Sequence, residues 1–235
     1  MKISVVLPAY NEVDNVGELT IRLSNSLQKL NIDHEILYVI QGKDGAYEKL
    51  ISMKNKFPQL RLIYFPEAIG VGPAFITGFK NISRDITHVL TMDADLNHQP
   101  EEFPLFLKAW KKFNTDLIIG SRKIKGGKME NTPPLKNLIS SFTNILFKYI
   151  FGLPVNDITS GYRLYKREVI DKIVNKLSSK NFEFYPEVII WAKKLGFSMI
   201  EVPITFKYRI YGESKLNFFT SGIGYIKLLY LRLFK

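Results

Sequence analysis

The chain has 235 residues, of which 46% are hydrophobic and 23% charged, and this composition excludes a disordered protein. It has no cysteine and three histidines, so the sequence offers no disulfide and no thiolate metal site, and a histidine-built zinc site is not expected. The net charge of +11 lies in the second half, where residues 120–235 carry 20 Lys and Arg against 8 Asp and Glu. This asymmetry favours an anionic partner: nucleic acid, a phosphorylated substrate or an anionic membrane face.

Short apolar runs alternate with segments of helical periodicity in the first half of the chain. The pattern predicts strands at residues 3–7, 35–40, 60–65, 88–92 and 116–119, and helices at 14–30, from about 72, and at 100–113. The first strand should end at Pro8, because proline lacks the backbone donor. Parallel strands need crossover connections, so this order predicts an α/β domain with a mixed, mostly parallel sheet between helices.

The pattern changes after residue 120. Glycines and prolines predict a loop over 121–134, followed by helices at 135–150 and 183–195 and an edge strand at 198–206 that contains Pro203. No stretch reaches 18 uncharged apolar residues, and the first apolar run is too short for a signal peptide, so neither a transmembrane helix nor a leader is expected. We expect one domain over 1–215 and a basic extension, 216–235, whose amphipathic helix packs on the domain or associates with a membrane.

Two carboxylates, Asp93 and Asp95, directly follow the fourth predicted strand, with the small Ala94 between them. Ligands of open α/β sheets bind at the carboxyl ends of strands, and Mg²⁺ or Mn²⁺ takes carboxylate oxygens and shares its shell with substrate phosphates. The motif therefore indicates a metal–diphosphate site with Asn97 as a third oxygen ligand and His98 beside it. A solvated acidic turn is the alternative interpretation.

Other segments point to ligand binding less specifically. In the turn after the first strand, Tyr10 can stack on a base and Glu12 can accept hydrogen bonds; the alternative is a turn capped by Asn11. Residues 70–75 lack the third glycine of a dinucleotide-binding motif and predict a loop that permits close approach of a ligand or backbone. Cations stand in turns of the basic half and together favour an anion site, although each alone is an ordinary surface charge: Arg122, Arg163, Arg209 and Lys215.

These pieces, taken in order, carry a family resemblance. The chain resembles the family 2 glycosyltransferases of GT-A fold, and among them the dolichol-phosphate and polyprenol-phosphate mannosyltransferases and their glucosyl relatives. The matching segments cover nearly the whole chain: Pro8-Ala9-Tyr10-Asn11-Glu12, Gly70-Val71-Gly72-Pro73-Ala74, Met92-Asp93-Ala94-Asp95-Leu96-Asn97-His98, Gly120-Ser121-Arg122 with Gly126-Gly127, Thr159-Ser160-Gly161-Tyr162-Arg163, Glu201-Val202-Pro203-Ile204-Thr205-Phe206 and Gly212-Glu213-Ser214-Lys215.

The resemblance implies inverting transfer of a hexose from a nucleotide diphosphate sugar to a lipid phosphate. It implies that Asp93, Asp95 and Asn97 hold Mg²⁺ or Mn²⁺, with Asn97 where the family usually has Gln. It places the donor on Pro8, Ala9, Tyr10, Glu12, Gln41, Gly72, Asp93, Ala94, Asp95 and Lys215, and the acceptor phosphate on Arg122, Lys136, Ser140 and Arg209. Asp95, Arg122 and Arg209 are the implied catalytic residues.

The chain departs from the family at two further positions. Lys136 stands where the family has Arg, which replaces a two-pronged contact by a point charge. Gln41 stands where the family usually ends its second strand with two Asp residues before Gly, so weaker donor binding is expected unless Asp44 compensates.

We therefore expect transfer of mannose from GDP-mannose to a polyprenyl or dolichyl phosphate by a peripheral protein at the cytoplasmic membrane face. Mannose is preferred because residues 126–127 and 130–131 resemble the mannosyl branch. The expected partners are the nucleotide sugar, the lipid phosphate, the membrane surface and a membrane protein, without nucleic acid. A UDP-sugar-dependent transferase and a non-catalytic relative that binds lipid phosphate or a partner remain alternatives, and the acidic motif argues against a nucleic-acid binder.

Overall fold

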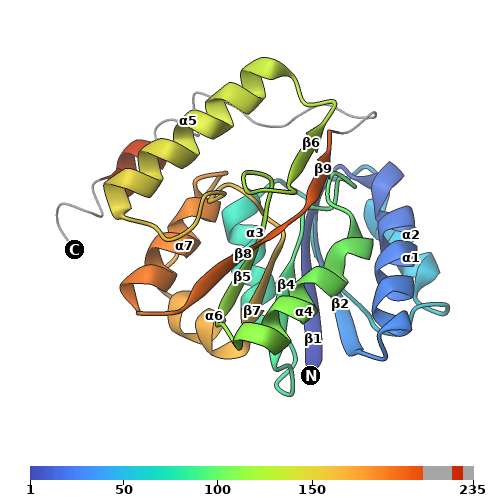
Figure 1. Cartoon of the computed structure of the whole chain (residues 1–235). Helices are drawn as coiled ribbons and strands as arrows, with labels where there is room; N and C mark the ends of the chain where they lie inside the picture. The colour runs from blue at the N-terminus through green and yellow to red at the C-terminus, as the bar shows by residue number, and fades with distance from the viewer. Residues whose placement is uncertain (209–223, 230–235) are drawn as a thin grey trace.

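The computed structural model describes residues 1–208 and 224–229. Its centre is a seven-stranded sheet in the order β3-β2-β1-β4-β7-β5-β8, parallel except for β7. The strands are β1 (Lys2–Tyr10), β2 (Asp33–Gln41), β3 (Leu60–Phe65), β4 (His88–Thr91), β5 (Leu117–Ser121), β7 (Arg163–Lys166) and β8 (Met199–Pro203). The prediction of a mixed, mostly parallel sheet between helices is confirmed (Figure 1).

Helices cover both faces of this sheet. On one face pack α1 (Val13–Lys29), α2 (Ala46–Met53) and α4 (Phe103–Phe113), the last preceded by a 3₁₀ turn, η1 (Pro100–Glu102). On the other face pack α3 (Val71–Lys80), α6 (Arg167–Ile173) and α7 (Phe184–Lys194). A separate pair of parallel strands, β6 (Lys128–Glu130) and β9 (Thr205–Lys207), lies beneath α5 (Pro134–Phe151).

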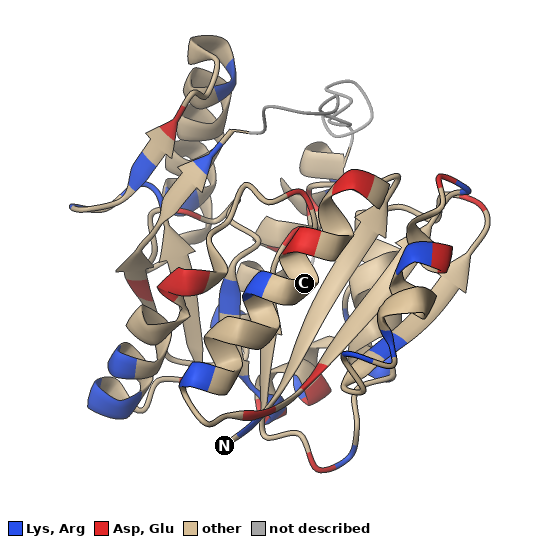
Figure 2. Cartoon of the chain, turned by 90° about the vertical axis from the view of Figure 1, so that its right-hand side faces the viewer, with Lys and Arg blue, Asp and Glu red and all other residues tan. Residues whose placement is uncertain are grey.

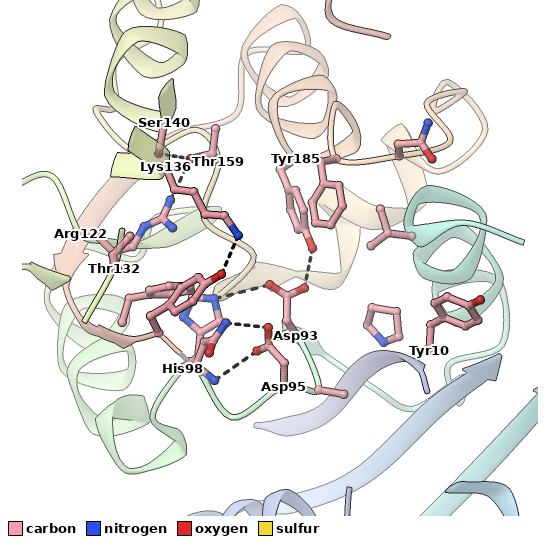
Figure 3. Close-up of a pocket in the computed structure, with 18 of the residues that line it drawn as sticks. Tyr10, Asp93, Asp95, His98, Arg122, Thr132, Lys136, Ser140, Thr159 and Tyr185 are labelled. Atoms are coloured by element: carbon pink, nitrogen blue, oxygen red, sulfur yellow. Dashed lines mark hydrogen bonds and ion pairs between the residues drawn. The ribbon is translucent and has the colours of Figure 1, made fainter. Parts of the chain in front are cut away.

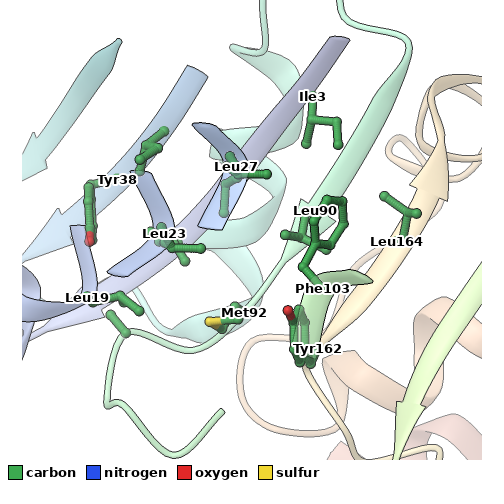
Figure 4. Close-up of a cluster of buried hydrophobic side chains, with 14 of the residues drawn as sticks. Ile3, Leu19, Leu23, Leu27, Tyr38, Leu90, Met92, Phe103, Tyr162 and Leu164 are labelled. Atoms are coloured by element: carbon green, nitrogen blue, oxygen red, sulfur yellow. The ribbon is translucent and has the colours of Figure 1, made fainter. Parts of the chain in front are cut away.

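The alternation of side chains along each strand divides the core into two clusters. In β1, Ile3, Val5 and Leu7 face α1, whereas Val6 faces α3. Figure 4 shows Leu19, Leu23 and Leu27 of α1 in one row, because their spacing of four residues keeps them on one face of the helix. The sheet is therefore buried on both faces, and its strand ends are the edge where open α/β sheets bind ligands.

Prolines fit the sheet for different reasons. The first strand runs through Pro8 to Tyr10, so the expectation that Pro8 ends it is wrong. Pairing of β1 with β4 stops at Val6, and beyond that residue β1 pairs with β2 alone. A strand that is paired on one side only can accommodate Pro8, which has no backbone N–H to donate. Pro203 closes β8, which lies at the sheet edge as predicted.

Several elements differ from the sequence predictions. Strand β7 and helices α2 and α6 were not predicted, and the expected loop 121–134 contains the short strand β6. The expected strand 198–206 is broken at Ile204, whose carbonyl accepts from Lys128, so the chain leaves the main sheet there and joins β6. The other predicted strands and helices occur with ends shifted by a few residues.

Helix α5 is amphipathic, but it turns its polar face toward the domain and its apolar face outward. Its polar row of Lys136, Ser140 and Asn144 faces the domain, and Asn144 is buried. Its large apolar side chains face outward, and Leu138, Phe142 and Tyr149 are 67%, 64% and 79% exposed. The outer face of α5 is therefore an apolar surface beside the strand ends.

Residues 224–229 form a helical segment that packs on the domain. Leu228 is buried in the cluster around α3 and α7, and the ring of Tyr225 meets Phe147 of α5 edge-on at 5.4 Å. Within residues 1–208 and 224–229, no helix is long and apolar enough to cross a bilayer.

Candidate active site

A cavity of about 580 Å³ opens at the carboxyl ends of the parallel strands, below α5. In β1 and β2 the charged residues stand only near the amino ends of the strands, so the carboxyl ends of these strands reach the cavity with uncharged side chains (Figure 2). The cavity lining includes Pro8, Tyr10, Glu12, Gln41, Asp93, Ala94, Asp95, Asn97, His98, Arg122, Lys136, Ser140, Thr159, Tyr185 and Tyr208. Most of the residues expected for donor, metal and acceptor therefore share one cavity.

The loop after β4 presents the acidic motif. Asp95, 9% exposed, accepts hydrogen bonds from the backbone N–H of Asn97 at 3.1 Å and from its Nδ2 at 2.7 Å. This geometry turns Oδ1 of Asn97 away from Asp95, and among the described residues that buried oxygen has no hydrogen-bond partner. An unpartnered amide oxygen beside two carboxylates matches the ligand set of Mg²⁺ or Mn²⁺.

No group of three His, Cys, Asp or Glu side chains suited to a metal occurs within residues 1–208 and 224–229. Two carboxylates and an amide oxygen are nevertheless enough when substrate phosphates complete the shell, as is usual for magnesium. The oxygen atoms that Asp93, Asp95 and Asn97 present at this loop therefore fit a divalent cation.

Asp93 is held from two sides (Figure 3). The hydroxyl of Tyr185 donates to Oδ1 at 2.5 Å, and Nε2 of His98 lies 3.7 Å from Oδ2. Burial raises the pKa of Asp93, but the contacts of His98 and Tyr185 outweigh burial and lower it overall, so the carboxylate is ionised. Burial and the charge of Asp93 raise the pKa of Tyr185 well above its ordinary value, which keeps this phenol a donor.

Gln41 is 2% exposed, and its Oε1 accepts the backbone N–H groups of Ile69 at 2.7 Å and Gly70 at 3.0 Å. Because both partners are donors, the side-chain oxygen faces the loop before α3 and the amide nitrogen is left for the cavity. Asp44 is absent from the cavity lining, because its carboxylate accepts the N–H groups of Val13 and Ala46 at two helix starts.

Two expected donor residues lie outside the cavity lining. Ala9 is fully buried in the core under α1. Gly72 packs against the backbone before α7, and a Cβ there would lie 1.9 Å from the carbonyl oxygen of Ser179. The close approach predicted for this loop is therefore made by backbone, and Gly72 has a packing role.

Arg122 enters the cavity with a fixed orientation. Its Nε and Nη2 each donate to Asp157 at 2.7 Å, and Nη2 also donates to Thr159 at 2.8 Å. The two charged side chains are 8% and 0% exposed. Burial raises the pKa of Asp157, but the adjacent guanidinium more than offsets this and lowers it to about 2, so both groups are charged.

Two of the residues expected to bind the acceptor phosphate lie on α5. Nζ of Lys136 donates to the hydroxyl of Tyr208 at 2.6 Å, and Oγ of Ser140 lies 3.3 Å from Oγ1 of Thr159. Arg209 and Lys215 lie outside the described residues. Arg163, one of the turn cations, is fully buried and donates to backbone carbonyls, so it is a structural residue.

Four residues of the site were not found from the sequence: Asp157, Thr159, Tyr185 and Tyr208. Tyr185 reaches Asp93 across 92 positions of sequence and Asp157 reaches Arg122 across 35. Thr159 stands in a segment that carried the family resemblance, which was the one signal available for it.

The sequence comparisons agree with this geometry. Residues 4–174 match the family described as Glycosyl transferase family 2. The chain is 37% identical over 222 residues to a dolichol-phosphate mannosyltransferase of Pyrococcus furiosus, with 92% of this chain and 60% of that protein covered. It is 32% identical over 220 residues to an undecaprenyl-phosphate mannosyltransferase of Micrococcus luteus, with 92% and 88% covered. The chain thus spans less than two thirds of the archaeal relative and most of the bacterial one.

Solved structures share the fold at lower identity. Mannosyl-3-phosphoglycerate synthase from Rubrobacter xylanophilus has a TM-score of 0.72 at 15% identity, with 99% of this chain and 74% of that chain covered. Glucosyl-3-phosphoglycerate synthase from Mycobacterium tuberculosis, in complex with Mg²⁺ and UDP, has a TM-score of 0.70 at 18% identity, with 97% and 78% covered. The expected GT-A fold is confirmed.

Proposed function

The chain belongs to glycosyl transferase family 2, and from that premise we propose that it moves a hexose from a nucleotide diphosphate sugar to a polyprenyl phosphate. The observation that carries this proposal is the shared cavity, with Asp93, Asp95 and Asn97 at one side and Arg122 and Lys136 at the other. GDP-mannose is the favoured donor, since the relatives compared above are named for mannosyl transfer to polyprenol phosphates.

Oxygens of Asp93, Asp95 and Asn97 would hold Mg²⁺ or Mn²⁺, which supplies positive charge against the diphosphate that leaves the sugar. Tyr185 and His98 hold the carboxylate of Asp93 in place. Tyr10, 38% exposed at the end of β1, offers its ring to the base, and Gln41 offers its amide nitrogen.

The reaction needs little acid–base chemistry from the protein. A phosphomonoester has a second pKa of about 6, so the acceptor is already a dianion at neutral pH. One of its oxygens forms a bond to the anomeric carbon while the bond from that carbon to the diphosphate oxygen breaks, with inversion. The protein's contribution is to align the two substrates and to compensate their charges.

Arg122, Lys136 and Ser140 would bind the acceptor phosphate, with Arg209 as a further expected ligand. Arg122 approaches with its orientation set by Asp157, so its cost of ordering on binding is small. Lys136 and Ser140 lie one helical turn apart on the inner face of α5.

The outer face of α5 supports peripheral attachment to a membrane, which we place at the cytoplasmic face. Its exposed apolar side chains lie on the far side of the helix that carries the acceptor ligands, so a lipid phosphate can reach the cavity from the bilayer. The double change Leu138→Ser and Phe142→Ser should lower co-sedimentation with anionic liposomes severalfold. Phe113→Ser, which removes an aromatic side chain that is 57% exposed on α4, is the control, and equal sedimentation of all forms would contradict the membrane assignment.

A donor panel tests the proposed reaction. GDP-mannose, UDP-glucose and UDP-galactose are each incubated with the protein, a prenyl phosphate in detergent and Mn²⁺, and the lipid phase is assayed for sugar. We expect label from GDP-mannose. Transfer from a UDP-sugar instead identifies the glucosyl-type alternative, and binding of prenyl phosphate without any transfer identifies a non-catalytic relative.

A further inference from the structure

Lys136 stands where the resembled family has an arginine, and it lies beside Tyr208 in the cavity. Nζ of Lys136 lies 2.6 Å from the hydroxyl oxygen of Tyr208, and both side chains are half-buried and line the cavity. Among the described residues Lys136 has no carboxylate partner, so its charge is available to an anion. In Figure 3 Lys136 reaches from α5 toward the Asp93 loop.

The direction of this hydrogen bond follows from chemistry. An ammonium group has donors only, so Tyr208 must accept, and its own hydroxyl proton points elsewhere. Within the described part of the chain that hydroxyl makes no second hydrogen bond. The pair therefore offers two kinds of donor side by side, the remaining N–H groups of Lys136 and the O–H of Tyr208.

Backbone hydrogen bonds also hold the segment that carries Tyr208. Its N–H donates to the carbonyl of Glu130 in β6 at 2.9 Å, and the N–H of Lys207 donates to the carbonyl of Asn97 at 2.8 Å. The hydroxyl is thereby positioned between the loop that fits the metal and the inner face of α5. The spacing of Nζ and Oη is close to that of two oxygens of one phosphate group.

We infer that Lys136 and Tyr208 together form a two-donor clamp for the acceptor phosphomonoester, in which the tyrosine hydroxyl supplies the second prong that an arginine would supply alone. Arginine binds phosphate through two parallel N–H groups, whereas lysine is a point charge. Tyr208 is thus an acceptor-binding residue of this chain. The inference rests on the proposed function for the identity of the acceptor.

The test is a rescue experiment on two residues. Tyr208→Phe should raise the KM for prenyl phosphate by about tenfold to a hundredfold, the effect of one charge-assisted hydrogen bond, with the donor KM unchanged. Lys136→Arg restores both prongs from one side chain, so the double variant with Tyr208→Phe should return the acceptor KM to within about threefold of the wild type. Tyr47→Phe on α2, outside the cavity lining, is the control for loss of a phenol and should change neither KM.

A binding arm separates this inference from the proposed function. Geranyl phosphate is titrated calorimetrically into wild type and Tyr208→Phe without any donor. If the wild type binds it at least tenfold more tightly but transfers no sugar, the transferase proposal fails and the clamp stands. Equal affinities, no binding to either form, a raised donor KM, or a folded double variant that is not rescued would each overturn the clamp.

Discussion

Removing the carboxylate of Asp157 should destabilise the protein strongly. Asp157 is fully buried and receives two hydrogen bonds of 2.7 Å from the side chain of Arg122 and one of 2.9 Å from its backbone. Asp157→Ala leaves a guanidinium that is 8% exposed without its counter-charge, and breaking such a buried pair costs about 3–5 kcal/mol. Since domains are stable by about 5–15 kcal/mol, this is a large fraction of the total.

Urea unfolding followed by circular dichroism at pH 7 measures this loss. Asp171→Ala is the matched control, because its exposed pair with Arg167 is worth less than about 1 kcal/mol. The pKa of Asp157 falls from its ordinary value of 3.8 to about 2, so its contribution of roughly 2 kcal/mol is present above pH 3.8 and lost as the pH falls toward 2. A loss below about 1 kcal/mol for Asp157→Ala would refute the reasoning.

Three further predictions concern separate parts of the chain. Gln41→Ala should lower the free energy of unfolding in urea by about 1–3 kcal/mol, because two loop N–H groups lose their acceptor. Gln41→Glu keeps that acceptor and should stay within about 1 kcal/mol of the wild type. Equal losses for the two variants would contradict the loop contact. Gly72→Ala should lower the melting temperature sharply, because its Cβ would meet the carbonyl of Ser179. Gly17→Ala meets only the flexible end of a lysine and should be neutral or stabilising by up to about 1 kcal/mol. A greater loss of stability in Gly17→Ala than in Gly72→Ala would refute the packing role. Burial lowers the pKa of His88 to about 4, so the folded protein resists protonation of this side chain. The free energy of unfolding should therefore fall by about 3 kcal/mol as the pH drops from 6.5 to 4. If His88→Phe shows the same dependence of stability on pH as the wild type, this prediction is contradicted.

Periodicity predicted the elements that bury a continuous apolar face. The stripe of Leu19, Leu23 and Leu27 required α1, and the uncharged run at residues 88–92 required a buried strand. Strand β7 was not predicted, because its four residues, Arg163–Lys166, include a charged residue at each end. Arg163 is tolerated inside because it donates to the carbonyls of Ile158 and Tyr185, which only the folded chain brings together.

Helix α5 illustrates a different limit. Its period of apolar residues predicted a helix, but amphipathicity does not state which face meets the domain. The structure turns the polar row inward because Lys136, Ser140 and Asn144 find partners there, including the N–H of Ile158. The sequence therefore predicted that these side chains share a face, and only the structure placed that face over the cavity.

The site was predictable where motif and strand end coincide. Asp93, Asp95 and Asn97 follow β4 directly, so local sequence was enough to place them together. The residues that orient them, such as Tyr185 on Asp93, come from distant segments and carry no local signal. The same holds for Tyr208, which contacts Lys136 across 72 positions of sequence.

The most direct test of the account is sugar transfer from GDP-mannose to a prenyl phosphate, measured with Mn²⁺ and with a chelator for the wild type and Asp95→Asn. The account predicts lipid-linked mannose from the wild type with Mn²⁺, and at least a hundredfold less from the chelated wild type and from the variant, while both proteins melt at similar temperatures. Transfer at the wild-type rate by Asp95→Asn in chelator would contradict a metal-dependent glycosyltransferase centred on this loop.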